Sequence, residues 1–234
     1  MKIGIIVAME KEFAQLHKLL SDTTVERHHN KGLVSSIFQF TFGRVGNNEI
    51  IMQQCGIGKI NSAVGTAEMI ARYQPDFIIS TGCAGGADTR LNIADVVVST
   101  ECTYHDAYCG SNCAMGQIMG MPERYASPLE LIDKATSLDC ETNIHKGLIV
   151  SGEWFVDTRE KMQSILNNFP EAAAVDMESC SIAQTCHLYN TPFLSFRIIS
   201  DIPLKDTNAT QYFDFWERMA NSSFQVTKHF LENL

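Results

Sequence analysis

Ala172-Ala173-Ala174-Val175-Asp176-Met177-Glu178 is a short apolar run that ends in two acids. The same pattern recurs at Phe193-Leu194-Ser195-Phe196-Arg197-Ile198-Ile199-Ser200-Asp201 and at Ile3-Gly4-Ile5-Ile6-Val7-Ala8-Met9-Glu10-Lys11-Glu12. Short apolar runs of this kind are typical of buried strands. In α/β sheets, ligands bind outside the carboxyl ends of the strands. We therefore expect Glu12, Glu178 and Asp201 to meet in one site.

Similar apolar runs alternate with helical segments along the chain. The patterns predict strands at Lys2–Val7, Leu33–Phe42, Glu49–Gln54, Asp76–Ser80, Asp95–Thr103, Gly147–Val150, Ala172–Val175 and Pro192–Ile199. They predict helices near 10–20, 59–73, 128–137, 158–168, 178–189 and 210–232. This alternation indicates an α/β fold, with a mixed, largely parallel central sheet and helices on both faces. A hairpin around Gly46-Asn47-Asn48 is expected to add antiparallel strands.

The expected last helix, 210–232, carries one apolar stripe. Its members are spaced by three, four or seven residues, as on one face of a helix: they are Phe213, Trp216, Ala220, Phe224 and Leu231. We expect this helix to pack on the sheet and its first turn to border a pocket.

Composition narrows the classes of function. A chain of 234 residues that is 45% hydrophobic and 19% charged fits a single domain over 1–234. The net charge of −9 is spread over 27 acids and 18 bases without long runs, which argues against a nucleic-acid or membrane partner and favours a small molecule. Neither a signal peptide nor a run of ~20 apolar residues is visible, so we expect a cytoplasmic protein.

The eight cysteines are therefore expected to be reduced. Cys109 and Cys113 lie close together, but they lack a second Cys or His pair at zinc-site spacing. We expect no metal site.

Each of the three acids also has a purely structural explanation. Glu178 stands at the start of a helix, where it would act as a cap, and where the helix dipole would favour its ionised form. Asp201 would begin a turn, and Glu12 would belong to a solvated helix face. Several acids in one crevice, however, can divide the proton-transfer roles that a hydrolase needs.

Two glycine-rich stretches follow apolar runs, at Cys55-Gly56-Ile57-Gly58-Lys59 and Ser80-Thr81-Gly82-Cys83-Ala84-Gly85-Gly86. Glycines allow the main chain to approach a ligand closely, so these stretches are candidate sources of backbone donors. Neither matches the P-loop or the complete dinucleotide fingerprint.

Taken in order, these motifs resemble the 5′-methylthioadenosine/S-adenosylhomocysteine nucleosidases of the purine nucleoside phosphorylase superfamily. The resemblance covers the whole chain. It rests on Lys2–Ile6 with Ala8–Glu10 and Glu12, Gly56–Lys59, Thr81-Gly82 with Ala84–Gly86, Tyr104-His105-Asp106-Ala107, Gly147–Gly152, and Met177-Glu178 with Ser200-Asp201.

The resemblance implies a cofactor-free homodimer that hydrolyses the N-glycosidic bond of adenosine thioethers and releases adenine and a thioribose. It implies that Asp201 is the general acid at adenine N7, that Glu12 activates the water, and that Glu178 holds the ribose hydroxyls. The remaining substrate-binding residues that it implies are Met9, Ile57, Cys83, Ala84, Gly85, Phe155, Val156, Met177, Arg197, Ser200 and Phe213.

Two departures from the family pattern are visible. Cys83 stands where a serine is common, and Tyr108-Cys109-Gly110-Ser111-Asn112-Cys113 replaces an Asp-Val-Thr-Ala segment of the family. The altered segment leaves the 5′ substituent open, so hydrolysis of another 5′-modified purine nucleoside such as futalosine is an alternative. A non-catalytic nucleoside-binding protein is an alternative of a different class. Glu12 favours water over phosphate as the nucleophile, because a carboxylate repels phosphate.

Overall fold

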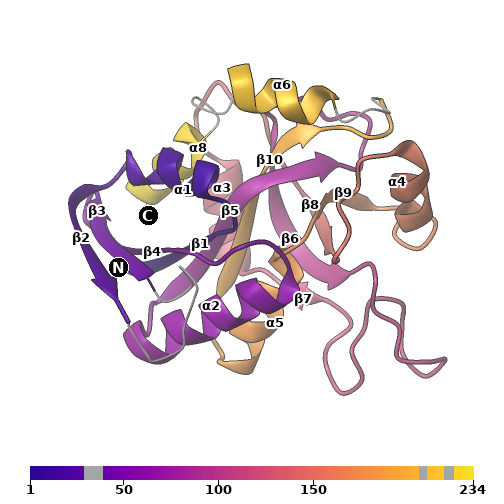
Figure 1. Ribbon diagram of the computed structural model, residues 1–234, viewed down its shortest axis with the longest axis horizontal. Helices are drawn as coiled ribbons and strands as arrows, with labels where there is room; N and C mark the ends of the chain where they lie inside the picture. Colours follow the sequence, from indigo (N-terminus) through magenta and orange to yellow (C-terminus); the bar gives the residue numbers. More distant parts are fainter. Residues whose placement is uncertain (29–38, 206–209, 219–223) are drawn as a thin grey trace.

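The computed structural model describes residues 1–28, 39–205, 210–218 and 224–234 (Figure 1). Its strands are β1 (Lys2–Val7), β2 (Ser21–Arg27), β3 (Gln39–Val45), β4 (Asn48–Gln54), β5 (Phe77–Gly86), β6 (Val96–Tyr104), β7 (Tyr125–Ala126), β8 (Ile144–Ser151), β9 (Ala172–Asp176) and β10 (Phe193–Asp201). Its helices are α1 (Glu10–His17), α2 (Lys59–Tyr73), α3 (Leu129–Thr136), α4 (Arg159–Leu166), α5 (Ser179–Leu188), α6 (Thr210–Arg218) and α8 (Gln225–Glu232).

The strands form one mixed sheet that closes on itself at one end. β5 pairs in parallel with β10 and antiparallel with β9. β10 continues to β6, β6 to β8, and β8 to β9, so these five strands form a ring. β1, β4, β3 and β2 extend the sheet from β5. The ring matters for function because it brings the ends of β5, β9 and β10 together.

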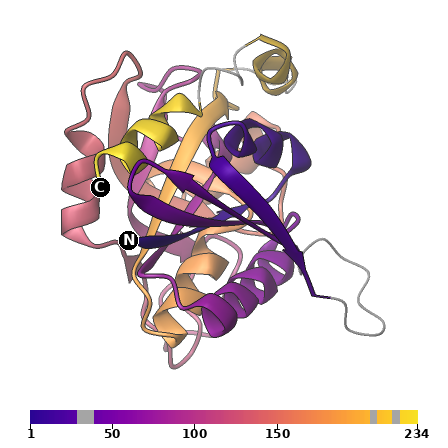
Figure 2. The ribbon, with the colours of Figure 1, turned by 90° about the vertical axis from the view of Figure 1, so that its left-hand side faces the viewer.

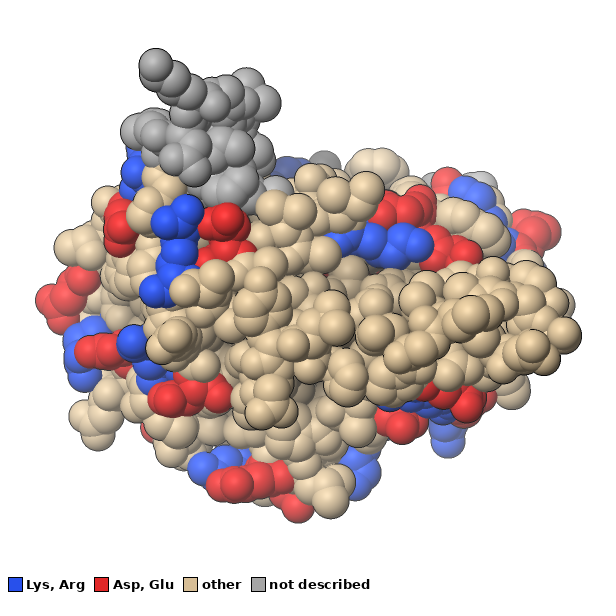
Figure 3. Space-filling model, turned by 90° about the horizontal axis from the view of Figure 1, so that it is seen from below, with Lys and Arg blue, Asp and Glu red and all other residues tan. Residues whose placement is uncertain are grey.

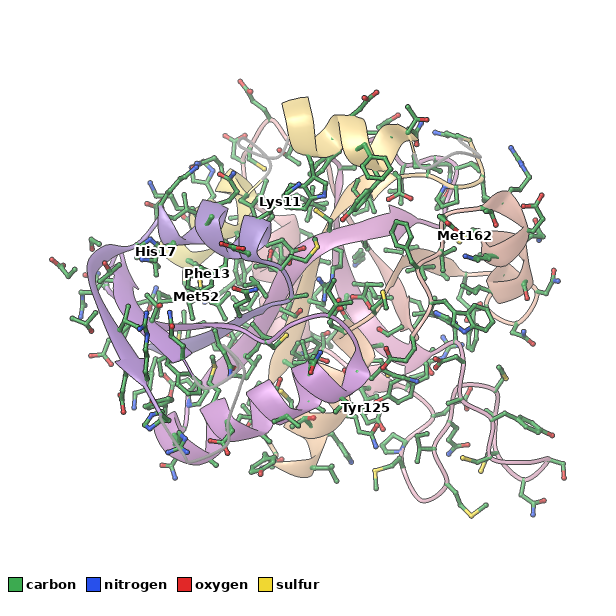
Figure 4. All side chains as sticks on the ribbon, in the orientation of Figure 1. Lys11, Phe13, His17, Met52, Tyr125 and Met162 are labelled. Carbon is green, nitrogen blue, oxygen red and sulfur yellow. The ribbon has the colours of Figure 1, made fainter. Side chains whose placement is uncertain are left out.

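Helices cover both faces of the sheet (Figures 1 and 2). α2 and α5 pack against each other on one face, whereas α1, α3 and α8 lie on the other. Figure 4 places Phe13 on α1, which packs on the second face, and Met162 on α4, whose buried side chains belong to a separate apolar cluster. Within the described residues, no helix has the length and apolarity that a membrane span requires.

The predicted α/β fold is confirmed, and the hairpin at Gly46-Asn47-Asn48 joins β3 to β4 in antiparallel register. The predicted strand Leu33–Phe42 lies partly outside the described residues. Its last four residues form the beginning of β3, which runs from Gln39 to Val45. Sequence patterns missed β2, whose seven residues are all exposed and show no apolar alternation. Pairing with β3 holds it in place.

The prediction of one helix over 210–232 is wrong. α6 ends at Arg218 and α8 begins at Gln225, and the two helices occupy different places in the fold (Figure 2). The predicted apolar stripe therefore does not form one buried face. Phe213, which belongs to that stripe, is 63% exposed, whereas Phe215, which does not, is 1% exposed. α8 packs on the sheet as expected, with Phe230 and Leu231 buried.

Candidate active site

A cavity of about 110 Å³ opens at the carboxyl ends of β1, β5, β9 and β10. All three motifs that end in acids contribute to its lining, together with residues from other segments. The lining residues are Ala8, Met9, Glu12, Ile57, Cys83, Ala84, Gly85, Trp154, Phe155, Val156, Val175, Asp176, Met177, Glu178, Ser200, Asp201 and Tyr212.

Strand pairing explains why distant acids share this cavity. Gly85 near the end of β5 is the register partner of Val175 on β9 and of Asp201 on β10. The carboxyl end of β1 lies beside β5 on the other side. The three acids named from sequence therefore line a single cavity, although they lie up to 189 positions apart, between Glu12 and Asp201.

Glu12 is buried, with 1% of its surface exposed. Its Oε2 accepts hydrogen bonds from the backbone N–H groups of Ala8 (3.2 Å) and Met9 (2.9 Å), and its Oε1 accepts one from Cys83 (2.9 Å). Burial raises the pKa of Glu12, and these bonds oppose the rise. Glu12 is thus a fixed, desolvated carboxyl group rather than part of a solvated helix face.

Glu178 occupies the N-cap position of α5 but makes no side-chain capping bond there. Its Oε1 instead accepts a 2.9 Å hydrogen bond from the backbone of Gly58, at the start of α2. Burial raises the pKa of Glu178 to about 8. The net shift runs against the ionised form expected at a helix N-terminus, because the cost of burying the charge is larger.

Asp201 is 5% exposed and lies next to Ser200, whose hydroxyl is 2.7 Å from Asp201 Oδ1 and 3.3 Å from the carbonyl oxygen of Ala84. One hydroxyl has one proton. It can donate a hydrogen bond to either oxygen, and its own oxygen can accept a hydrogen bond from a protonated carboxyl group. Ser200 is therefore suited to both protonation states of Asp201.

Arg197 lies beneath the cavity and does not line it. It is 1% exposed, and its Nε is 2.6 Å from Asp176 Oδ2. The same guanidinium donates to the hydroxyls of Ser179 (3.0 Å) and Ser80 (2.7 Å). The pair joins the strands β5, β9 and β10 below the site. Asp176, which the sequence patterns did not single out as a site residue, both lines the cavity and holds Arg197.

Most of the residues named from sequence border the cavity, but two do not. Arg197 is underneath, and Phe213 is exposed, whereas its neighbour Tyr212 lines the cavity. Tyr212 packs edge-on against Phe155, with ring centroids 5.4 Å apart. Sequence reasoning missed Tyr212 and Trp154, although each is adjacent to a named residue. The glycine-rich stretches do supply backbone donors, but the N–H groups of Gly58 and Cys83 bond to Glu178 and Glu12.

The Phosphorylase superfamily model matches residues 2–232. The chain is 37% identical to a 5′-methylthioadenosine/S-adenosylhomocysteine nucleosidase from Desulfotalea psychrophila, over 100% of this chain and 98% of the relative. The chain belongs to this nucleosidase family.

Solved structures from this family have the same fold. An S-adenosylhomocysteine nucleosidase from Streptococcus pyogenes, in complex with 5-methylthiotubericidin, superposes with a TM-score of 0.90 at 33% identity, over 100% of this chain and 97% of that one. A 5′-methylthioadenosine/S-adenosylhomocysteine nucleosidase from Colwellia psychrerythraea, in complex with adenine, gives a TM-score of 0.89 at 33% identity, over 100% and 96% of the chains. The family resemblance inferred from the motifs is thereby confirmed.

Proposed function

We propose that this chain hydrolyses the N-glycosidic bond of 5′-methylthioadenosine and S-adenosylhomocysteine, releasing adenine and the thioribose. The observation that carries this proposal is the single cavity lined by Glu12, Glu178 and Asp201, in a chain that belongs to the nucleosidase family. Cleavage places positive charge on the sugar and negative charge on the departing base, so carboxyl groups are needed on both sides of the bond.

Asp201 is proposed as the general acid that protonates adenine N7. Its neighbour Ser200 supports this role, because the hydroxyl accepts from the protonated carboxyl group and donates to the carboxylate that remains after proton transfer. Phe155, which is 46% exposed at the cavity, offers a ring face for stacking on the base. The backbone of Val156 is proposed to bond to the edge of the base.

Glu12 is proposed to orient the attacking water and to take its proton. A carboxylate has about four acceptor positions. Three of those on Glu12 are used by backbone N–H groups, so one position remains for a water molecule. The raised pKa of Glu12 makes it a stronger base than an ordinary glutamate. Glu178 is proposed to accept hydrogen bonds from the ribose hydroxyls.

We also propose that two copies of the chain form a homodimer through the face that carries α2 and α5. Figure 3 views the molecule from that side and shows a broad area without charged side chains. Its exposed apolar residues come from α2 and from the loop that follows β6: they include Ile60, Val64, Tyr108 and Met119. Large exposed apolar patches commonly mark protein interfaces.

A cytoplasmic location is proposed for the enzyme. All eight cysteines are free thiols, which suits a reducing compartment.

The proposed activity is tested by measuring adenine release from methylthioadenosine, adenosylhomocysteine and unmodified adenosine, with and without inorganic phosphate. We expect release from both thioethers at a rate that does not depend on phosphate. Phosphate-dependent release, or turnover confined to a nucleoside with a different 5′ group, would contradict the proposal. Size-exclusion chromatography with light scattering tests the homodimer.

A further inference from the structure

Three segments far apart in the chain meet beside the cavity. One is the start of α2, at Gly58 and Lys59. The second is Asp106, two residues after the end of β6. The third is the segment 152–156, which follows β8 and carries Phe155 and Val156 along the cavity wall. Segment 152–156 has no regular secondary structure and is held by individual hydrogen bonds. Two of them run from Gly152 N–H to the Asp176 carbonyl (3.2 Å) and from Lys161 Nζ to the Phe155 carbonyl (3.1 Å).

Glu153 bonds this segment to α2. Its Oε1 accepts a 2.8 Å hydrogen bond from the backbone N–H of Lys59, in the first turn of the helix. The preceding residue, Gly58, has φ = +95°, and a Cβ atom there would lie 2.7 Å from Glu153 Oε2. Glycine at position 58 therefore permits both the backbone turn and the close approach of Glu153.

Lys59 and Asp106 complete the connection. The ammonium group of Lys59 lies 2.9 Å from both carboxylate oxygens of Asp106, and Asp106 Oδ2 accepts a 2.8 Å bond from the backbone N–H of Glu153. The side chains of Lys59 and Asp106 are partly buried, with 27% and 11% of their surfaces exposed, whereas Glu153 is exposed. Lys59 also lies over the Tyr104 ring, 5.2 Å from its centroid. We refer to Glu153, Lys59 and Asp106 as the clasp.

The clasp joins the two halves of the proposed nucleoside site. The same turn of α2 that binds Glu153 provides the Gly58 N–H that bonds to Glu178, the proposed ribose anchor. The segment held by Glu153 carries Phe155, the proposed base contact. None of the three clasp side chains lines the cavity, so they act through the residues they hold.

We propose that the clasp is a positioning device that fixes the base-binding segment relative to the ribose anchor, so that Glu153 and Lys59 determine affinity for the nucleoside. This inference rests on the proposed function. Breaking the clasp removes the link between segment 152–156 and α2 and loosens the turn that supports Glu178. The bonds from Gly152 N–H to the Asp176 carbonyl and from Lys161 Nζ to the Phe155 carbonyl remain, and Glu12 and Asp201 keep their own bonds. Binding is therefore weakened much more than the chemical step.

The test compares Glu153→Ala and Lys59→Met with the conservative variants Glu153→Gln and Lys59→Arg. Glutamine keeps an acceptor for the Lys59 N–H, and arginine keeps the ion pair with Asp106. We expect the two disruptive variants to raise KM for methylthioadenosine and Kd for adenine by about tenfold, as loss of one hydrogen bond to a charged group predicts, with much smaller changes in kcat. The conservative variants should retain most of the affinity.

Lys134→Met is the matched control, because it removes a lysine from a 3.9 Å surface pair on α3 and should change neither KM nor Kd. A merely structural role would lower Tm in the disruptive variants and leave KM and Kd at wild-type values, and that result would overturn the inference. So would a fall in kcat at constant KM. Failure of the proposed function is distinguishable, since wild-type protein would then release no adenine, whereas adenine binding by calorimetry still tests the clasp.

Discussion

Gly82 on β5 lies against the Glu12 carboxylate, and Gly82→Ala should displace that carboxylate. A Cβ atom at position 82 would lie 2.5 Å from Glu12 Oε1 and 2.8 Å from Nη1 of Arg197. Both side chains are 1% exposed, and each is held by bonds to neighbouring strands. Neither can move aside without breaking those bonds, so the added methyl group must disturb the proposed base.

The expected loss follows from the bonds of Glu12. Moving Oε1 away from the new methyl group breaks its 2.9 Å bond from the Cys83 N–H, and a hydrogen bond to a charged group contributes ~1.5–3 kcal/mol. A misplacement of ~1 Å in a catalytic group costs ~10²-fold in rate. We therefore expect Gly82→Ala to lower kcat by about 100-fold, measured as adenine release from methylthioadenosine at saturating substrate.

Gly147→Ala is the matched control for this variant. A Cβ atom at Gly147 would also lie 2.5 Å from its nearest neighbour, but that neighbour is the Cβ of Ala173, and neither residue lines the cavity. This variant should lower Tm through overpacking and change kcat little. If folded Gly82→Ala protein has wild-type kcat, Glu12 is not held as described and is not the base.

Four further outcomes are expected. Glu12→Gln should still bind methylthioadenosine in a calorimeter but fail to hydrolyse it, and a variant with lost binding and intact chemistry would contradict the role of Glu12. Asp201→Asn should lower kcat by ~10²–10⁴-fold, as removal of a general acid does; unchanged turnover would exclude that role. Arg197→Met leaves the buried Asp176 carboxylate without its ion-pair partner and should lower the unfolding free energy in urea by ~3–5 kcal/mol. In the pH profile of kcat/KM, the apparent pKa on the acid side should lie above the ordinary glutamate range. Burial raises the pKa of both Glu12 and Glu178, the latter to about 8, and both are proposed to act as carboxylates. An apparent pKa near 4.5, the ordinary glutamate value, would contradict this expectation. The same shifts set the sign for stability. The folded state binds the carboxyl protons of these groups more tightly than the unfolded state does. The contribution of Glu178 to the free energy of unfolding is therefore fully present below pH 4.5 and is lost as pH rises through about 8.

Several strands and one helix were predictable from short stretches of sequence alone. Apolar runs located β1, β4, β6 and β9 to within one residue at either end, and α2 was predicted with its observed bounds. β2 lacked such a signal, because it is exposed throughout and depends on pairing with β3.

The candidate site was also predictable only in part. Glu12, Glu178 and Asp201 were named from their positions after apolar runs, and the cavity brings all three together. Their electrostatics were not predictable, because a pKa depends on burial, and burial depends on residues that are remote in sequence. Glu178 illustrates this: it starts a helix, yet it is held by Gly58, 120 positions away, and its pKa rises.

The sequence by itself determined the fold class, the family and the acids of the proposed chemistry, since these depend on residue type, order and spacing. Only the tertiary structure decided which neighbour faces the cavity, as with Tyr212 in place of Phe213, and how deeply Arg197 lies beneath it. The clasp belongs to the second group as well, because its bonds span 47 and 94 positions. Contacts across such separations depend on how strands and helices pack in space, and no local pattern of residues records them.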